Sequence, residues 1–210
     1  MKKPTVVCFG EVLWDMLPTG KVAGGAPMNV AYHLNNLGVE SLMISQVGAD
    51  DLGKELLAFL QTKGLTIDFI QVVNEHPTST VQVKLNESGS PTYTIVENVA
   101  WDAIDFDAAN YSTIESADAL VYGSLAARKE QTRNTLLALL KLAKLKVLDL
   151  NLRKPFYSFE LLQPLLYAAD IVKLSDEELV EIATNQQLAG HSELQLLQLL
   201  KEKYHCKGLC

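Results

Sequence analysis

Short apolar runs alternate with longer amphipathic segments along most of the chain. Five runs are almost continuously apolar, which is typical of strands buried on both faces of a sheet; they span residues 5–9, 41–47, 119–122, 146–150 and 171–174. Four segments carry apolar residues at helical spacing; they span residues 27–37, 52–63, 136–143 and 194–204. This alternation predicts an α/β fold with a doubly wound, mostly parallel sheet.

Two stretches, residues 11–22 and 67–97, lack helical periodicity and are predicted to form a small inserted β-sheet. In the second stretch, apolar and polar residues alternate on both sides of a predicted turn at 86–90, which is typical of a β-hairpin. The apolar positions are Val81, Val83, Leu85, Tyr93 and Ile95. Because an apolar sheet face needs a cover, this sheet is predicted to lie over a ligand site as a lid, to pair with a second subunit, or both.

Composition narrows the class of protein. A chain of 210 residues with 48% hydrophobic residues is expected to form one domain over 1–210 with a substantial core. The net charge of −7 argues against nucleic-acid binding. The sequence shows neither a signal-peptide core nor a stretch of membrane-spanning length. The three cysteines, at positions 8, 206 and 210, do not suggest a disulfide framework, so a reducing cytoplasm is the expected location.

Polar residues follow all five predicted strands. Since ligands bind beyond the carboxyl ends of the strands in open α/β sheets, these residues predict a pocket on one rim of the sheet. They include Glu11, Asp15, Asp50, Ser124, Asn151, Arg153, Ser175 and Glu178. Helix capping is an alternative explanation for some of them: Asp50 fits an N-cap, and Ser175 with Glu178 fits a capping box.

A glycine pair gives the strongest local signal. Gly24 and Gly25 precede a predicted helix that opens with Pro27 and carries Asn29 in its first turn. Glycines let a backbone approach a ligand closely, and an asparagine side chain offers both a donor and an acceptor to hydroxyl groups. The sequence contains neither GxxxxGK[ST] nor GxGxxG, so it supports neither a P-loop nor the usual dinucleotide site.

Several motifs together resemble the ribokinase-like (PfkB-type) carbohydrate kinases. They are GEVLWD at 10–15, GGAPMNVAYHLNNLG at 24–38 and VGADDLG at 47–53. The segments DLNLR at 149–153 and VKLSDEEL at 172–179 are similar to the fructokinase branch of that family. The resemblance covers essentially the whole chain, and it implies a doubly wound core with a β lid.

The resemblance also implies an activity, the transfer of the γ-phosphoryl group of ATP to a sugar hydroxyl with Mg²⁺. Carried over by position, the residues that would hold the sugar hydroxyls are Asp15, Gly24, Gly25 and Asn29. A carboxylate such as that of Asp15 accepts charge-assisted hydrogen bonds from hydroxyl groups, which suits a polyol. Trp101 is a further candidate for contact with a sugar face, although a core or dimer contact is the more common role of a tryptophan.

The residues expected to contact the phosphate and the cofactor lie on later segments of the chain. Arg153 would face the transferred phosphate, where a planar guanidinium neutralises developing charge. Asn151, Ser175 and Glu178 are the candidates for the cofactor side, and Glu178 would organise Mg²⁺ through water. Ser175 stands where ribokinases carry an asparagine, a difference that is compatible with the fructokinase branch.

One family motif is missing from the sequence. Family members carry a GAGD segment whose helix start forms an anion hole and whose aspartate is the catalytic base, and the similar Gly48-Ala49-Asp50-Asp51 has the wrong residue and lies too early. We therefore expect an incomplete carboxyl end and an inactive chain, within an intact protein that is a kinase.

Other readings stay open at this point. The sequence does not separate fructose, the choice by resemblance, from ribose, nucleosides or 2-keto-3-deoxygluconate. A non-catalytic sugar-binding remnant and a nicotinamide-dependent oxidoreductase are the competing classes, and the second lacks its glycine fingerprint. The expected partners are a sugar, ATP and a second copy of the chain that pairs through the lid.

Overall fold

The computed structural model describes residues 3–85, 91–105, 108–188 and 190–210. Its strands are β1 (Thr5–Phe9), β2 (Leu13–Leu17), β3 (Gly20–Gly24), β4 (Glu40–Gly48), β5 (Ile70–Val73), β6 (Thr80–Leu85), β7 (Pro91–Ile95), β8 (Ala119–Gly123), β9 (Lys146–Asp149), β10 (Ile171–Lys173) and β11 (Gly208–Leu209). Its α-helices are α1 (Ala26–Asn36), α2 (Asp51–Thr62), α3 (Ala108–Ser116), α4 (Glu130–Leu140), α5 (Phe159–Ala168), α6 (Asp176–Asn185) and α7 (Glu193–Tyr204). Two short 3-10 helices are η1 (Ala100–Ala103) and η2 (Leu125–Arg128).

The main sheet has the order β11-β10-β9-β8-β1-β4-β5, and all its pairs in the described residues are parallel. The chain builds outward from β1 in one direction through β4 and β5, and then returns to β8 on the other side of β1. The point of reversal therefore lies between β1 and β8. Ligands of doubly wound sheets bind at the carboxyl end of such a point.

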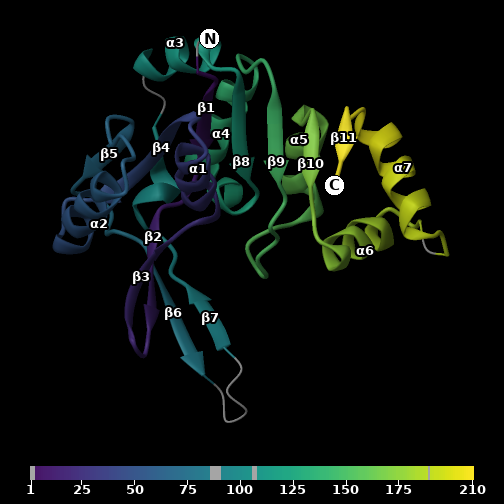
Figure 1. Cartoon of the computed structure of the whole chain (residues 1–210). Coiled ribbons are helices and arrows are strands. Elements are labelled where there is room, and N and C mark those ends of the chain that lie inside the picture. The colour runs from purple at the N-terminus through teal and green to yellow at the C-terminus, as the bar shows by residue number, and fades with distance from the viewer. Residues whose placement is uncertain (1–2, 86–90, 106–107, 189) are drawn as a thin grey trace.

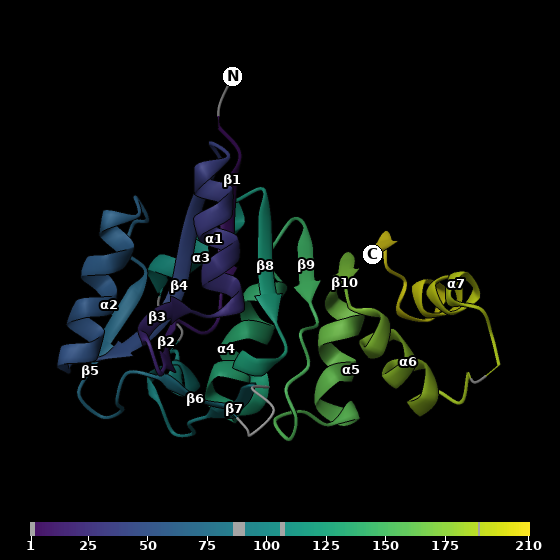
Figure 2. The ribbon, with the colours of Figure 1, turned by 60° about the horizontal axis from the view of Figure 1, so that its bottom comes forward.

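Successive side chains of β1 pack on opposite faces of this sheet. Val7 and Phe9 belong to a large buried cluster that includes side chains of α3, α4 and α5 and continues to α6 and α7. In Figure 2, the ribbons of α4, α5, α6 and α7 follow one another from the middle of the view to its right side. Cys8 belongs to a second cluster, in which the sheet packs against α1 and α2. Burial on both faces explains why these strands read as continuous apolar runs in the sequence.

The second sheet has the order β3-β2-β6-β7 and extends beyond the carboxyl ends of the main strands (Figure 1). β2 pairs with β3 and β6 pairs with β7 in antiparallel fashion, whereas β2 and β6 are parallel. We call this sheet the lid. The predicted lid strands within 11–22 and 67–97 differ in two ways, because β3 continues to Gly24 and because β5 joins the main sheet beside β4. The predicted turn at 86–90 and the side chains of Val83, Leu85 and Tyr93 lie outside the described residues.

Polar contacts attach the lid to α2. The indole Nε1 of Trp14 in β2 donates to the carbonyl of Leu52 at 3.0 Å. Lys21 in β3 forms an ion pair with Glu55 and lies 5.0 Å from the centre of the Trp14 ring. Because these contacts with α2 come from one position on each of two lid strands, the base of the lid has a defined orientation relative to the main sheet.

The predicted elements agree with most of these boundaries. The five predicted strands correspond to β1, β4, β8, β9 and β10, and three predicted helices correspond to α1, α2 and α7 within a residue at each end. The helix predicted at 136–143 instead spans Glu130–Leu140. Beyond the five predicted strands, the terminal residues Gly208–Leu209 form β11, parallel to β10. Among the described residues, we find no helix with the length and apolarity needed to cross a membrane.

Candidate active site

A cleft of about 620 Å³ lies between the carboxyl edge of the main sheet and the lid. This size is in the range of small-molecule sites, roughly 300–1,000 Å³. Glu11 directly follows β1 and Leu125 follows β8, so the cleft opens at the reversal point of the sheet. Its lining residues are Glu11, Leu13, Asp15, Gly25, Ala26, Asn29, Val81, Ile95, Leu125, Asp149, Asn151 and Arg153.

The residues predicted to hold a sugar meet in this cleft. Asp15 lies on β2, Gly25 precedes α1, and Asn29 lies in the first turn of α1, where its backbone N–H donates to the Gly25 carbonyl at 2.9 Å. Gly24 pairs with Leu13 in the lid, and a Cβ atom at Gly24 would lie 2.4 Å from Asp15 Oδ2. The missing side chain of Gly24 therefore makes room for the Asp15 carboxylate.

Gly25 has a specific backbone role. Its φ of 117° lies in a region that L side chains rarely adopt, and a Cβ atom there would lie 2.3 Å from the Glu11 carbonyl oxygen. Only glycine fits such a close approach without strain. The paired glycines thus serve two separate purposes, since one admits a carboxylate and the other admits a neighbouring backbone.

Burial perturbs the two carboxyl groups on this side of the cleft. Glu11 is 2% exposed, its Oε1 accepts from the Ala26 N–H at 3.2 Å, and its Oε2 has no hydrogen-bond partner among the described residues. Desolvation raises the pKa of Glu11 to about 7, although the backbone hydrogen bonds and the charge of Arg153 oppose this rise. Desolvation also raises the pKa of Asp15. Sequence reasoning placed Glu11 on this rim but gave it no role.

Asn151 and Arg153 reach the cleft from the segment that follows β9. Asn151 adopts a left-handed backbone with φ of 42°, a conformation that asparagine tolerates better than most residues. The Arg153 side chain is exposed, and its Nη1 donates to the carbonyl of Leu152 at 2.9 Å. Asp149 lines the same wall and forms an ion pair of 2.9 Å with Lys173 on β10. The cleft therefore combines the Asp15 carboxyl group of the lid with the carboxyl groups of Glu11 and Asp149 and the guanidinium of Arg153 at the edge of the main sheet.

Ser175 and Glu178 do not line the cleft. They lie behind it, and Glu178 is bonded to the segment that forms one wall. They form the predicted capping box at the start of α6, in which the Ser175 N–H donates to Glu178 Oε2 at 2.9 Å. The other carboxylate oxygen, Oε1, accepts from the Leu152 N–H at 2.5 Å. Glu178 thus holds the segment that carries Asn151 and Arg153, and both its oxygens already accept backbone hydrogen bonds.

Trp101 lies in the core, which corrects its candidacy as a sugar contact. The side chain is fully buried in the large cluster, and it does not line the cleft. The guanidinium carbon of Arg128 lies 4.1 Å from the centre of its ring. Trp14 is likewise buried, against Phe59 of α2. Both tryptophans therefore have the packing role that is more common for this residue.

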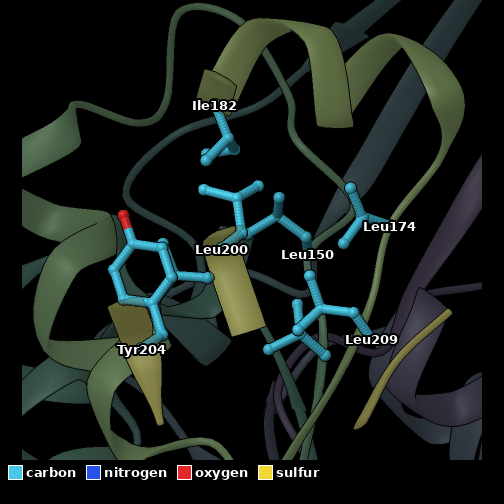
Figure 3. Close-up of a pocket in the computed structure, with 8 residues that line it drawn as sticks. Leu150, Leu174, Ile182, Leu200, Tyr204 and Leu209 are labelled. Carbon is cyan, nitrogen blue, oxygen red and sulfur yellow. The ribbon is translucent and has the colours of Figure 1, made fainter. Parts of the chain in front are cut away.

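A second cavity lies beneath β10 and β11, where apolar side chains from β9, α6 and α7 surround it (Figure 3). Its volume of about 10 Å³ is about that of one water probe, too small for a ligand. The one labelled side chain with a polar atom is Tyr204, whose hydroxyl is buried without a partner among the described residues. This cavity is a packing gap rather than a binding site. The described residues contain no cluster of histidine, cysteine or acidic side chains that fits a metal ion.

Comparison with known proteins agrees with this geometry. Residues 6–207 match the model of the pfkB family carbohydrate kinases. The chain belongs to this family. It is 30% identical to a fructokinase from Solanum tuberosum over 208 residues, which cover 91% of this chain and 64% of the relative. The chain therefore spans slightly less than two thirds of that relative's length.

Solved structures show the same fold. Fructokinase from Xylella fastidiosa with bound ATP superposes with a TM-score of 0.83 at 25% identity, covering 99% of this chain and 68% of that chain. A sugar kinase from Pyrococcus horikoshii in complex with ATP gives a TM-score of 0.76 at 29% identity, covering 87% of this chain and 67% of that one. The ribokinase-like α/β architecture with its lid is therefore shared with ATP-bound relatives.

Proposed function

We propose that the intact protein is an ATP-dependent sugar kinase and that fructose is its substrate. One observation carries the proposal: Asp15, Gly25 and Asn29 meet Asn151 and Arg153 in a single cleft at the reversal point of the sheet. The membership of the chain in the pfkB family and the fructokinases among its relatives support it.

In this proposal each cleft residue has a chemical task. The Asp15 carboxylate accepts hydrogen bonds from two sugar hydroxyls, and the Asn29 amide both donates and accepts. Arg153 neutralises charge on the phosphoryl group during its transfer from ATP. Mg²⁺ would bind the phosphates and keep water ligands, since it dehydrates reluctantly. Because both oxygens of Glu178 accept backbone N–H groups, we propose that this residue acts on the ion through water.

Fructose binding by the chain tests the sugar site directly. Replacing Asp15 by asparagine removes charge-assisted hydrogen bonds, each worth about 1.5–3 kcal/mol, so we expect fructose to bind at least about tenfold more weakly. The matched control is Asp51→Asn, which removes the same charge from an exposed position at the start of α2. Titration calorimetry with fructose and ribose measures both variants. An unchanged dissociation constant for Asp15→Asn would contradict the site.

Turnover is a separate question, because the 210 residues contain no GAGD segment. We propose that they bind sugar without phosphorylating it, while the intact protein consumes ATP in the presence of fructose. The mass of the intact protein and an ATP-dependent assay with fructose and ribose test this. A protein of 23.1 kDa that binds fructose without turnover would instead favour a non-catalytic sugar-binding remnant.

We further propose that the protein works in the cytoplasm as a homodimer that pairs through the lid. Val22 on β3 is 51% exposed, so the lid presents an apolar side chain to solvent. Sedimentation of the protein and of Val22→Glu tests this proposal, since a buried charge at the interface shifts the equilibrium toward the monomer. A monomer at micromolar concentration would contradict it.

A further inference from the structure

A buried arginine lies directly behind the wall of the cleft. Arg128 ends η2, and its side chain is 2% exposed, next to an Asp102 side chain that is 4% exposed. Its Nε donates to Asp102 Oδ1 at 2.7 Å and its Nη2 donates to Asp102 Oδ2 at 2.8 Å. The pair is therefore bidentate, which fixes the plane of the guanidinium as well as its position.

Two aromatic rings contact the guanidinium. Its carbon lies 4.1 Å from the centre of the Trp101 ring and 4.7 Å from the centre of the Phe156 ring. Its Nη2 also donates to the carbonyl of Val96 at 2.7 Å. A planar, forked cation is suited to make all these contacts at once, whereas a lysine ammonium makes neither the fork nor the stack.

Besides η1, three segments meet at Arg128, and each of them contributes a residue to the cleft. Val96 follows Ile95 at the end of β7, and Leu125 begins η2. The Phe156 N–H donates to the carbonyl of Arg153 at 2.7 Å, so the stacked ring is tied to the loop of the candidate phosphate contact. Arg128 thus connects the base of the lid with the wall that carries Arg153.

The short helix η1, which contacts this arginine through Trp101 and Asp102, is itself bonded to α4. The Thr132 hydroxyl donates to the carbonyl of Trp101 at 2.8 Å and accepts from the Ile104 N–H at 2.9 Å. η1, which carries Trp101 and Asp102, is therefore anchored to one threonine of the core through a residue within it and the residue directly after it. A rigid base of this kind can transmit a defined position to the segments stacked on it.

Stability alone explains this arrangement poorly. A buried ion pair is often no more stabilising than apolar side chains of similar volume, because both charges lose their hydration. Arg128 also leaves its buried Nη1 without a hydrogen-bond partner among the described residues. The arrangement instead fixes the relative positions of three segments of the cleft wall, because one side chain contacts all three.

We propose that Arg128 is a positioning residue, which holds the loop of Asn151 and Arg153 against the base of the lid and so directs Arg153 toward the phosphate side of the cleft. The effect on Arg153 rests on the proposed function. The fixed position of the loop does not, and it can be measured without catalysis.

Hydrogen exchange tests the fixed loop. Phe156→Leu removes one ring and leaves the ion pair intact, while Arg128→Lys keeps the charge and loses the fork. In both variants we expect exchange of the hydrogen-bonded Leu152 and Phe156 amides to rise at least tenfold, while the amides of Gly53 and Thr78 stay unchanged. Leu56→Ala, a core change on the other sheet face, is the control for general loss of stability. Unchanged exchange in the loop, or an equal rise everywhere, overturns the proposal.

Ligand affinity tests whether the loop directs Arg153 toward a phosphate group in the cleft. Fructose and fructose 6-phosphate serve as probes, and Arg153 should make the second bind about tenfold tighter through a charge-assisted hydrogen bond. Phe156→Leu and Arg153→Ala should each abolish this gain, and the double variant should lose nothing more. The fructose affinity of Phe156→Leu, which does not line the cleft, should stay within twofold.

The outcomes separate the two proposals. A phosphate-dependent gain that survives in both Phe156→Leu and Arg128→Lys overturns the positioning role. If the unaltered protein binds neither probe, the proposed function fails, and the exchange measurement alone decides whether Arg128 fixes the loop.

Discussion

Replacing Glu11 by glutamine is expected to make the protein more stable at pH 8 and to leave its stability at pH 4.5 nearly unchanged. Glu11 is 2% exposed, and its Oε2 has no hydrogen-bond partner among the described residues. Its neutral form is therefore the one that fits the site. A glutamine has nearly the same shape, and its carbonyl oxygen can still accept the hydrogen bond from the Ala26 N–H.

The size of the effect follows from the pKa of Glu11, which burial raises from 4.5 to about 7. Below pH 4.5 the carboxyl group is protonated in both the folded and the unfolded protein, so it contributes no difference. Between pH 4.5 and 7 the unfolded chain releases the proton while the folded protein retains it, and stability falls as the pH rises. At about 1.4 kcal/mol for each pH unit, the loss reaches about 3 kcal/mol above pH 7.

Urea unfolding at half-unit steps from pH 4.5 to 8 measures this effect. The informative quantity is the difference between the variant and the unaltered protein, because the contributions of other titrating groups cancel in it. Glu115→Gln provides the matched control, since it removes the same charge from an exposed position of α3. Its difference is expected to stay within about 0.5 kcal/mol at every pH.

A flat difference between Glu11→Gln and the unaltered protein would refute the reasoning. It would mean that the Glu11 carboxylate is hydrated or paired in solution, so that its burial has no cost. A difference that rises toward low pH would refute it too, because that sign belongs to a carboxylate stabilised by the fold.

Three further substitutions test other parts of the site. Gly25→Ala should lower the free energy of unfolding in urea by about 1–3 kcal/mol, because its φ is strained for alanine and its Cβ would meet backbone; Gly208→Ala, where no atom lies within 4 Å of a Cβ, is the control. Trp101→Phe should lower thermal stability by about 1–2 kcal/mol yet leave the fructose dissociation constant within twofold, and a large loss of fructose affinity would return this residue to the site. Asp50→Ala should cost about 2 kcal/mol at pH 7, since it removes an N-cap and two bonds to Thr78. Burial opposes these bonds, but together the bonds lower the pKa of Asp50 from its ordinary 3.8, so the cost should decrease as the pH falls below that value, which unfolding in acid can check.

The main sheet could be predicted from sequence because burial on both faces leaves a plain signal. Each of the five predicted strands is a run of apolar residues, and all five appear in the sheet. The helices that were not predicted in full lack such a signal. α5 contains Pro164, and only the start of α6 was indicated, by the capping box of Ser175 and Glu178. Tertiary packing, rather than local pattern, fixes these helices.

The assignment of β5 to the lid failed for a different reason. Ile70–Val73 is short and follows directly on a stretch of alternating polarity, so the sequence does not show which sheet it joins. Strand pairing is a long-range property, and β5 finds its partner in β4. The site follows the same rule: Asp15, Gly25 and Asn29 belong to one local segment and were recognised together, whereas the burial of Glu11 depends on the surrounding fold.

The two crossings between the main sheet and the β6–β7 part of the lid are both tied by charged side chains. In the segment that leads into β6, Asp50 accepts hydrogen bonds from the Thr78 backbone N–H at 2.8 Å and from its hydroxyl at 2.7 Å. In the segment that follows β7, Arg128 donates to the carbonyl of Val96 at 2.7 Å. Because each tie bonds to atoms of a fixed segment, rotation of the lid about its base would break both.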